Sequence, residues 1–154
     1  MRRNDRAIIN EEARSLLESA EYGILSMAGP DGVPHGIPLN FSLAGDSIYF
    51  HCAPEGKKLV YLNANNSVWG QALLDYGFTD ECDYAYTSVH FKGKILLIED
   101  LNEKRHAMEV MVRQLSEKPE AKLATIKLEK LAKTTMGRID ISCMTGKKHQ
   151  KQQP

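Results

Sequence analysis

Residues 33–52 have the sequence VPHGIPLNFSLAGDSIYFHC, and they carry the clearest signal of the fold class. In its first eleven positions, apolar residues alternate with polar or small ones, which is the pattern of a strand with one buried face. The tripeptide AGD signals a turn, and SIYFHC has the composition of a partner strand. Two prolines fall on the opposite face, where each removes a ladder donor, so we expect an edge strand or a bulge. The stretch therefore predicts an antiparallel hairpin.

The segments on either side of this hairpin extend the same reading. The expected elements are a helix at 10–20, a strand at 22–27, a turn at 29–32, a short helix at 58–64, a strand at 68–74, a loop at 76–83, a strand at 85–98 bulged at Gly93, a helix at 101–116 capped by Asn102, a helix from Pro119 to about 133 and a strand at 136–143. The strands are joined by short links, without the alternation of strand and helix that a parallel sheet needs. We therefore predict a mainly β protein, an antiparallel β-barrel with peripheral helices.

Length and composition predict a single domain. The chain has 154 residues, of which 42% are hydrophobic and 26% charged, and a chain of this length can bury a core without disulfides or metal. We predict one domain over residues 1–146 and a basic, polar tail at 147–154 that is disordered. The three cysteines are scattered, which predicts reduced thiols, and the N-terminus has no signal-peptide pattern. We expect a cytoplasmic protein.

Charge and motifs argue against several classes of protein. Twenty basic residues balance twenty acidic ones, whereas nucleic-acid binders carry a basic excess. No apolar run approaches the ~20 residues that span a bilayer. The dinucleotide, Walker A, zinc-protease and hydrolase-elbow motifs are missing, and no spacing of His and Cys predicts a metal site. Enzymes in which a bound cofactor carries the chemistry remain open.

The sequence YFHCAPEGKK at residues 49–58 is the strongest candidate for a binding site. A strand ends, the chain turns through Pro54 and Gly56, and Lys57 and Lys58 then open a helical turn. Ammonium groups beside backbone N–H groups at a helix N-terminus favour a phosphate. The alternative is a solvated charged turn, which spacing alone favours because paired lysines are common on surfaces.

Other residues could contact a ligand, each with a structural alternative. His51 falls on the strand face opposite Phe50 and Cys52, where it could meet a ligand or lie at a surface or interface. Cys52 falls on the apolar face, which favours a buried, inert thiol. Asn40 lies mid-strand on the polar face, where its amide could bind a planar heterocycle or face solvent.

Four further residues have weaker signals. Tyr86 and Ser88 place hydroxyl groups on one strand, which suits either a polar ligand or a wetted sheet face. His35 falls on an apolar face and is expected to be a core histidine. The single tryptophan, Trp69, is expected in the core or at an interface.

Several segments together resemble a known family. They are MRRxDRxI at 1–8, YGILS at 22–26, DGVPHGIPLNF at 31–41, IYFHCAPEGKK at 48–58, YxSV at 86–89, KGK at 92–94, EK at 103–104 and IDISCMTGK at 139–147. In this order and spacing, the chain is similar to the FMN-binding split-barrel proteins related to pyridoxamine 5′-phosphate oxidase. Within that group it resembles the branch of the 5-nitroimidazole-resistance proteins.

The resemblance implies a six-stranded split barrel and a homodimer with FMN at the subunit interface. It implies that Lys57 and Lys58 hold the FMN phosphate. It places the following residues near the flavin: Pro38, Leu39 and Asn40 along the ring, His51 and Cys52 beside it, and Tyr86 and Ser88 on a strand that faces it. His51 is the one candidate for a catalytic role.

The function that this resemblance implies is electron transfer. We expect an FMN-dependent oxidoreductase that takes electrons from NAD(P)H or a similar donor and passes them to a small molecule, with nitro-aromatic compounds among the candidates. The alternative is a non-catalytic protein that stores or senses a flavin. The sequence departs from the oxidase itself, since it has no RxVLLK strand and no SRK, so we do not expect pyridoxamine phosphate oxidation. It also has His35 where the branch often has an aromatic residue.

Overall fold

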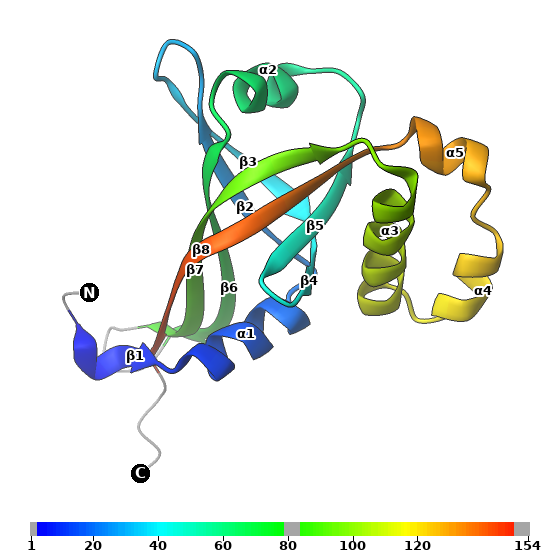
Figure 1. The fold of residues 1–154 in the computed structure, drawn as a ribbon. Coiled ribbons are helices and arrows are strands. Elements are labelled where there is room, and N and C mark those ends of the chain that lie inside the picture. Colours follow the sequence, from blue (N-terminus) through cyan, green and yellow to red (C-terminus); the bar gives the residue numbers. More distant parts are fainter. Residues whose placement is uncertain (1–2, 79–83, 150–154) are drawn as a thin grey trace.

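The computed structural model describes residues 3–78 and 84–149. In chain order, the elements are a 3-10 turn at Asn4–Arg6, β1 (Ala7–Ile8), α1 (Asn10–Ser19), β2 (Tyr22–Ala28), β3 (Pro34–Asn40), β4 (Ser42–Ala44), β5 (Ser47–Cys52), α2 (Lys57–Ala64), β6 (Ser67–Phe78), β7 (Tyr84–Ile98), α3 (Leu101–Leu115), α4 (Pro119–Ala124), α5 (Leu128–Lys133) and β8 (Thr135–His149). The predicted class, a mainly antiparallel sheet with peripheral helices, is confirmed (Figure 1).

The sheet curls into a barrel whose two edge strands are joined by the chain and not by a ladder of hydrogen bonds. Its strand order is β3-β2-β6-β7-β8-β5-β4, with β1 added beside β8. The two ends of this order, β3 and β4, are consecutive in sequence and are separated only by Phe41. Phe41 is 2% exposed and belongs to the core. At this residue the chain passes from β3, which pairs with β2, to β4, which pairs with β5. The barrel is thus split between β3 and β4.

This split corrects two expectations. The single strand expected at 33–43 is divided at Phe41, because β3 pairs with β2 while β4 pairs with β5. Only the β4–β5 part of the predicted hairpin forms. The sheet has eight strands rather than six, and the two additions are the separated β4 and the two-residue β1.

Two strands run beyond their predicted ends. β6 extends to Phe78, where Gly77 has a φ of 91° and the register with β7 shifts. β8 extends to His149, three residues into the expected tail, because these residues pair with β7 and the first of them also with β1. The predicted bulge at Gly93 is present as a register shift between β7 and β8. Met1, Arg2, Cys82 and residues 150–154 lie outside the described residues.

The helices cover the ends and one side of the barrel. Figure 1 shows α2 at one end, α1 with β1 at the other, and α3, α4 and α5 along the side. The cap of α3 is Asp100 rather than Asn102, since its carboxylate accepts a hydrogen bond from the Glu103 N–H at 2.8 Å. The single helix expected from Pro119 is two helices, α4 and α5.

Large rings fill the barrel where glycines leave space. Phe50 and Phe91 are almost fully buried in the main core. A Cβ added to Gly70 would lie 2.0 Å from Phe91 Cζ, and one added to Gly137 would lie 2.3 Å from Phe50 Cζ. A second core cluster lies outside the barrel, between the sheet and α3 with α5.

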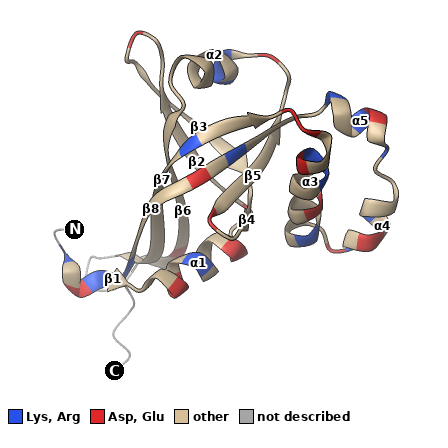
Figure 2. Ribbon diagram, viewed as in Figure 1, with Lys and Arg blue, Asp and Glu red and all other residues tan. Residues whose placement is uncertain are grey.

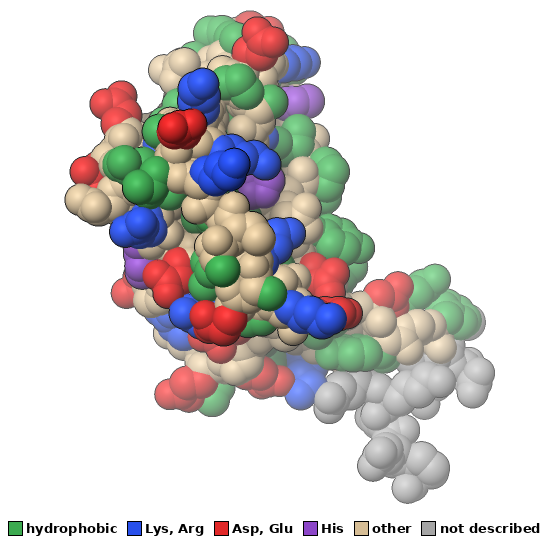
Figure 3. Space-filling model, turned by 90° about the vertical axis from the view of Figure 1, so that its right-hand side faces the viewer, with side chains coloured by type: hydrophobic (Ala, Val, Ile, Leu, Met, Phe, Trp, Pro, Cys, Tyr) green, Lys and Arg blue, Asp and Glu red, His purple; other side chains and the backbone are tan. Residues whose placement is uncertain are grey.

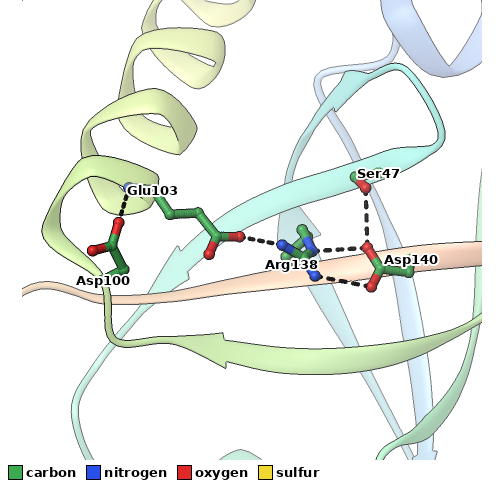
Figure 4. A network of polar contacts seen from close by, with 5 residues as sticks. All are labelled: Ser47, Asp100, Glu103, Arg138 and Asp140. Atoms are coloured by element: carbon green, nitrogen blue, oxygen red, sulfur yellow. Dashed lines mark hydrogen bonds and ion pairs between the residues drawn. The ribbon is translucent and has the colours of Figure 1, made fainter.

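An ionic network fastens α3 to the sheet (Figure 4). Arg138 of β8 forms ion pairs with Glu103 of α3 and with Asp140, where Nε and Oδ1 are 2.8 Å apart. Ser47 Oγ donates to Asp140 Oδ1 at 3.0 Å. Hydrogen bonds from Arg138 and then from Ser47 lower the pKa of Asp140. The network orients a helix and joins three elements.

Candidate functional site

The predicted phosphate-binding turn lies between β5 and α2, at one end of the barrel. Gly56 precedes α2 with a φ of 123°, which favours glycine and leaves the helix without a side-chain cap. Among the described residues, the backbone N–H groups of Lys57 and Lys58 have no hydrogen-bond acceptor, and neither ammonium group has a carboxylate partner. Figure 2 shows the basic segment at the start of α2. These donors match the chemistry that a phosphate needs.

Aromatic rings hold the two lysines in place. Lys57 Nζ lies 5.1 Å from the centroid of the Tyr61 ring, and Lys58 Nζ lies 5.9 Å from that of Phe50. His35 of β3 packs on the same Tyr61, with ring centroids 5.3 Å apart. His35 is half-buried, so it lies at the rim of the core rather than within it. Both contacts with Tyr61 link the lysine turn to β3.

His51 and Cys52 lie at the end of β5, just before this turn. His51 is exposed, as the alternation predicts, and Cys52 is half-buried against the core. The structure thus groups four of the predicted site residues at the α2 end of the barrel: His51, Cys52, Lys57 and Lys58.

A pocket of about 350 Å³ lies on the outer face of β6 and β7. It is lined by Gln71, Ala72, Leu73, Asp75, Tyr84, Tyr86, Ser88 and His90. Two of the predicted site residues, Tyr86 and Ser88, therefore line one pocket. Its walls combine aromatic and apolar groups with hydroxyl, amide, carboxylate and imidazole groups, as small-molecule pockets do.

Basic residues surround the Tyr86 phenol. Lys147 Nζ lies 5.6 Å from the centroid of its ring, and the His149 ring centroid lies 6.4 Å away. Hydrogen bonding to Lys147, and also to Arg6, lowers the pKa of the Tyr86 hydroxyl. Lys147, expected in the disordered tail, instead lies in β8, which pairs it with Ser88 beside the pocket.

The exposed residues of β3 lie on the same outer face as the pocket. The strand register aligns Pro38, Ile24, Gln71 and His90 in one row across β3, β2, β6 and β7. Asn40 is exposed, and its side-chain amide donates to the Glu21 carbonyl at 3.0 Å.

Two other β-strand residues depart from or refine the sequence reading, and a third lies on the same face as one of them. Leu39 points the other way and packs against the core. Trp69, expected in the core or at an interface, is 50% exposed on the outer face of β6. Leu73 is 61% exposed on the same face, which is therefore open and partly apolar.

One chain cannot bring these two groups of residues to one ligand. The register places His51 beside Met136, which pairs with Ile98, the last residue of β7. Tyr86 lies twelve residues earlier on β7, roughly 40 Å along the strand. The lysine turn and the pocket are therefore two half-sites at opposite ends of the barrel.

Sequence reasoning missed several residues of these half-sites. Tyr84 and His90 are spaced by two from Tyr86 and Ser88, so their shared face could have been read from the alternation. Tyr61 and Lys147 could not, because only the packing of α2 and the pairing of β8 bring them to their partners. No group of His, Cys, Asp and Glu suited to a metal ion occurs in the described parts of the chain.

Comparison with known proteins identifies one family, which agrees with the resemblance seen in the sequence. The family model described as pyridoxamine 5′-phosphate oxidase matches residues 10–148. No curated protein sequence matches the chain. None of the described helices combines the length and apolarity needed to cross a bilayer.

Solved structures share the fold over almost the whole chain. A candidate 5-nitroimidazole antibiotic resistance protein from Bacteroides thetaiotaomicron is 26% identical, with a TM-score of 0.81 over 92% of this chain and 85% of that chain. The flavocytochrome Anf3 from Azotobacter vinelandii is 19% identical, with a TM-score of 0.80 over 97% of this chain and 72% of that one. The FAD binding protein from Mycobacterium smegmatis is 23% identical, with a TM-score of 0.59 over 94% of this chain and 98% of that one.

Proposed function

Since this chain belongs to the pyridoxamine 5′-phosphate oxidase family, we propose that it is a flavoprotein that binds FMN and acts as an oxidoreductase. The observation that carries the proposal is the pair of lysines without carboxylate partners among the described residues, next to N–H groups without acceptors. A phosphate monoester supplies the charge and the acceptor oxygens that these groups lack. The names of two similar structures, a flavocytochrome and an FAD binding protein, support a flavin as the ligand.

The two half-sites support a homodimer as the binding form. Lys57 and Lys58 would hold the phosphate on one copy, while Tyr86 and Ser88 of the other copy would face the ring. A two-fold axis makes two such composite sites at once. The open outer face of β2, β3 and β6, with Trp69 half exposed, supplies apolar surface for the contact between copies.

Bound FMN would supply the electron-transfer chemistry, and the protein would hold and orient it. The aromatic contacts of Lys57 and Lys58 limit where the phosphate can lie. Lys147 and Arg6 favour a negative charge on or beside the Tyr86 hydroxyl. This hydroxyl can form a hydrogen bond with the polar edge of the flavin ring. His51, exposed at the end of β5, can donate to a bound anion or carry a proton. NAD(P)H is the proposed electron donor and a small molecule, such as a nitro-aromatic compound, the proposed acceptor.

Titration of the purified protein with FMN, FAD and riboflavin tests the ligand. We expect FMN to bind more tightly than riboflavin, with a perturbed visible spectrum. Equal affinity for the two would refute the phosphate site. Addition of NADH or NADPH to the FMN complex without oxygen then tests the activity. Bleaching of the flavin followed by reoxidation with a nitro-aromatic acceptor supports an oxidoreductase, whereas a flavin that neither donor reduces indicates storage or sensing.

A further inference from the structure

A second cleft, of about 320 Å³, lies between α3, α4 and α5, apart from both half-sites. Its lining combines apolar side chains from all three helices with arginine and glutamate side chains of α3 and α4. Figure 3 looks onto this side of the molecule, where apolar side chains lie between charges of both signs. The proposed flavin site uses none of these residues.

The cleft exists because the helix expected from Pro119 is interrupted. At the end of α4, the Thr125 N–H and hydroxyl both bond to the Lys122 carbonyl, at 3.1 and 2.7 Å. The chain then turns before α5, and α4 and α5 each pack on α3. Ile126, within this interruption, packs toward the second core cluster. The interruption separates the two helices and leaves a hollow against α3 that is lined by both apolar and charged side chains.

The floor of the cleft is apolar and its mouth is partly so. Leu131 is 2% exposed and belongs to the second core cluster, against which Met108 also packs. Leu128, the first residue of α5, is a large apolar side chain that is 50% exposed. An apolar ligand segment would cover this leucine and the floor without displacing any ion pair.

The charges around the cleft are unequal in their partners. Arg113 is held by two carboxylates, with Nη2 to Glu109 Oε1 at 3.0 Å and Nη1 to Glu120 Oε1 at 2.6 Å. Arg105 also lines the cleft, yet it has no ion pair or hydrogen bond among the described residues. The Arg105 guanidinium is therefore available to a ligand anion, whereas the two lining carboxylates share the single positive charge of Arg113.

We propose that this cleft binds a small amphipathic carboxylate, with its hydrocarbon chain on Met108, Leu123 and Leu128 and its carboxylate on Arg105. The volume is at the low end for ligand pockets, which suits a chain of about ten carbons. The site is independent of the flavin, so its occupancy and flavin binding are separate measurements.

Calorimetric titration with decanoate, 1-decanol and acetate tests the proposal. We expect decanoate to bind with a Kd on the order of 100 μM, and acetate not to bind. Arg105→Ala should weaken decanoate about tenfold, the equivalent of one charge-assisted hydrogen bond, and leave 1-decanol unchanged. Lys130→Ala, which removes an exposed charge of α5 outside the cleft, is the matched control and should change neither.

Filling the cleft tests its position. Leu123→Trp should abolish decanoate binding without changing the FMN titration. If that variant fails to fold, Leu128→Asn at the exposed mouth should weaken decanoate several-fold instead. Equal affinity of the wild-type protein for decanoate and 1-decanol, or binding that neither cleft variant alters, would overturn the proposal. A second copy of the chain in the cleft would also overturn the proposal. It would be seen as a changed oligomeric state of the cleft variant together with no decanoate binding by the wild-type protein.

Discussion

Replacing both Lys57 and Lys58 by alanine should selectively remove the affinity that the FMN phosphate contributes. Neither ammonium has a carboxylate partner in the described parts of the chain, so the substitutions break no ion pair within the protein. A hydrogen bond to a charged group contributes about 1.5–3 kcal/mol, and the lower value applies here because Lys57 is exposed and Lys58 half-buried. Two such contacts amount to about 3 kcal/mol, or roughly a 150-fold rise in the Kd for FMN.

The assay is fluorescence titration of wild-type and variant protein with FMN and with riboflavin. Riboflavin lacks the phosphate, so its Kd should be the same in both proteins. The double variant Lys122→Ala with Lys130→Ala removes the same charge from α4 and α5 and should bind FMN like the wild type. The variant without Lys57 and Lys58 also loses their cation–π contacts with Tyr61 and Phe50. Each such contact stabilises a protein by about 0.5–1 kcal/mol at an exposed site, so thermal unfolding is recorded alongside. A parallel loss of FMN and riboflavin affinity would refute the reasoning, because it would mean that the lysines stabilise the fold rather than bind phosphate.

Four other measurements test the dimer, His51, the barrel core and the ionic network. Light scattering at micromolar concentration should report about twice 17.3 kDa, and a monomer that retains stoichiometric FMN would contradict the composite site. His51→Ala should change the rate of flavin reduction by NAD(P)H but shift the free energy of unfolding by no more than about 0.5 kcal/mol, because the side chain is exposed; unchanged kinetics with a large loss of stability would make it structural. Gly70→Ala should destabilise the fold by about 1–3 kcal/mol in urea unfolding, because its Cβ would meet the buried Phe91 ring. The pKa of Asp140 is lowered in the folded state, so the ionised carboxylate stabilises the fold above its ordinary pKa of 3.8, and this stabilisation is lost as the pH falls through the folded pKa. Asp140→Asn should therefore lose less stability than the wild type on acidification below about pH 4, and identical pH profiles of unfolding would contradict this.

Local patterns in the sequence were enough for the approximate positions of most strands and for the lysine turn. The alternation from Pro34 to Asn40 survives in the structure as alternating exposure, because side chains of a strand point to opposite faces in turn. Gly56 before Lys57 and Lys58 predicts a turn into a helix, and α2 begins there. These features depend on residues within a few positions of each other, so the sequence carries them directly.

How these elements combine depends on contacts that form only in the folded chain. Phe41 lies within an unbroken period-two pattern, yet the chain changes partner strands at this residue: β3 pairs with β2, whereas β4 pairs with β5. The alternation likewise places Tyr86 on a face, but the register of β7 with β8 brings Lys147 to it and separates it from Lys57 by most of the length of a strand. Strand register and helix packing depend on contacts between residues far apart in sequence, whose free energy no local pattern expresses.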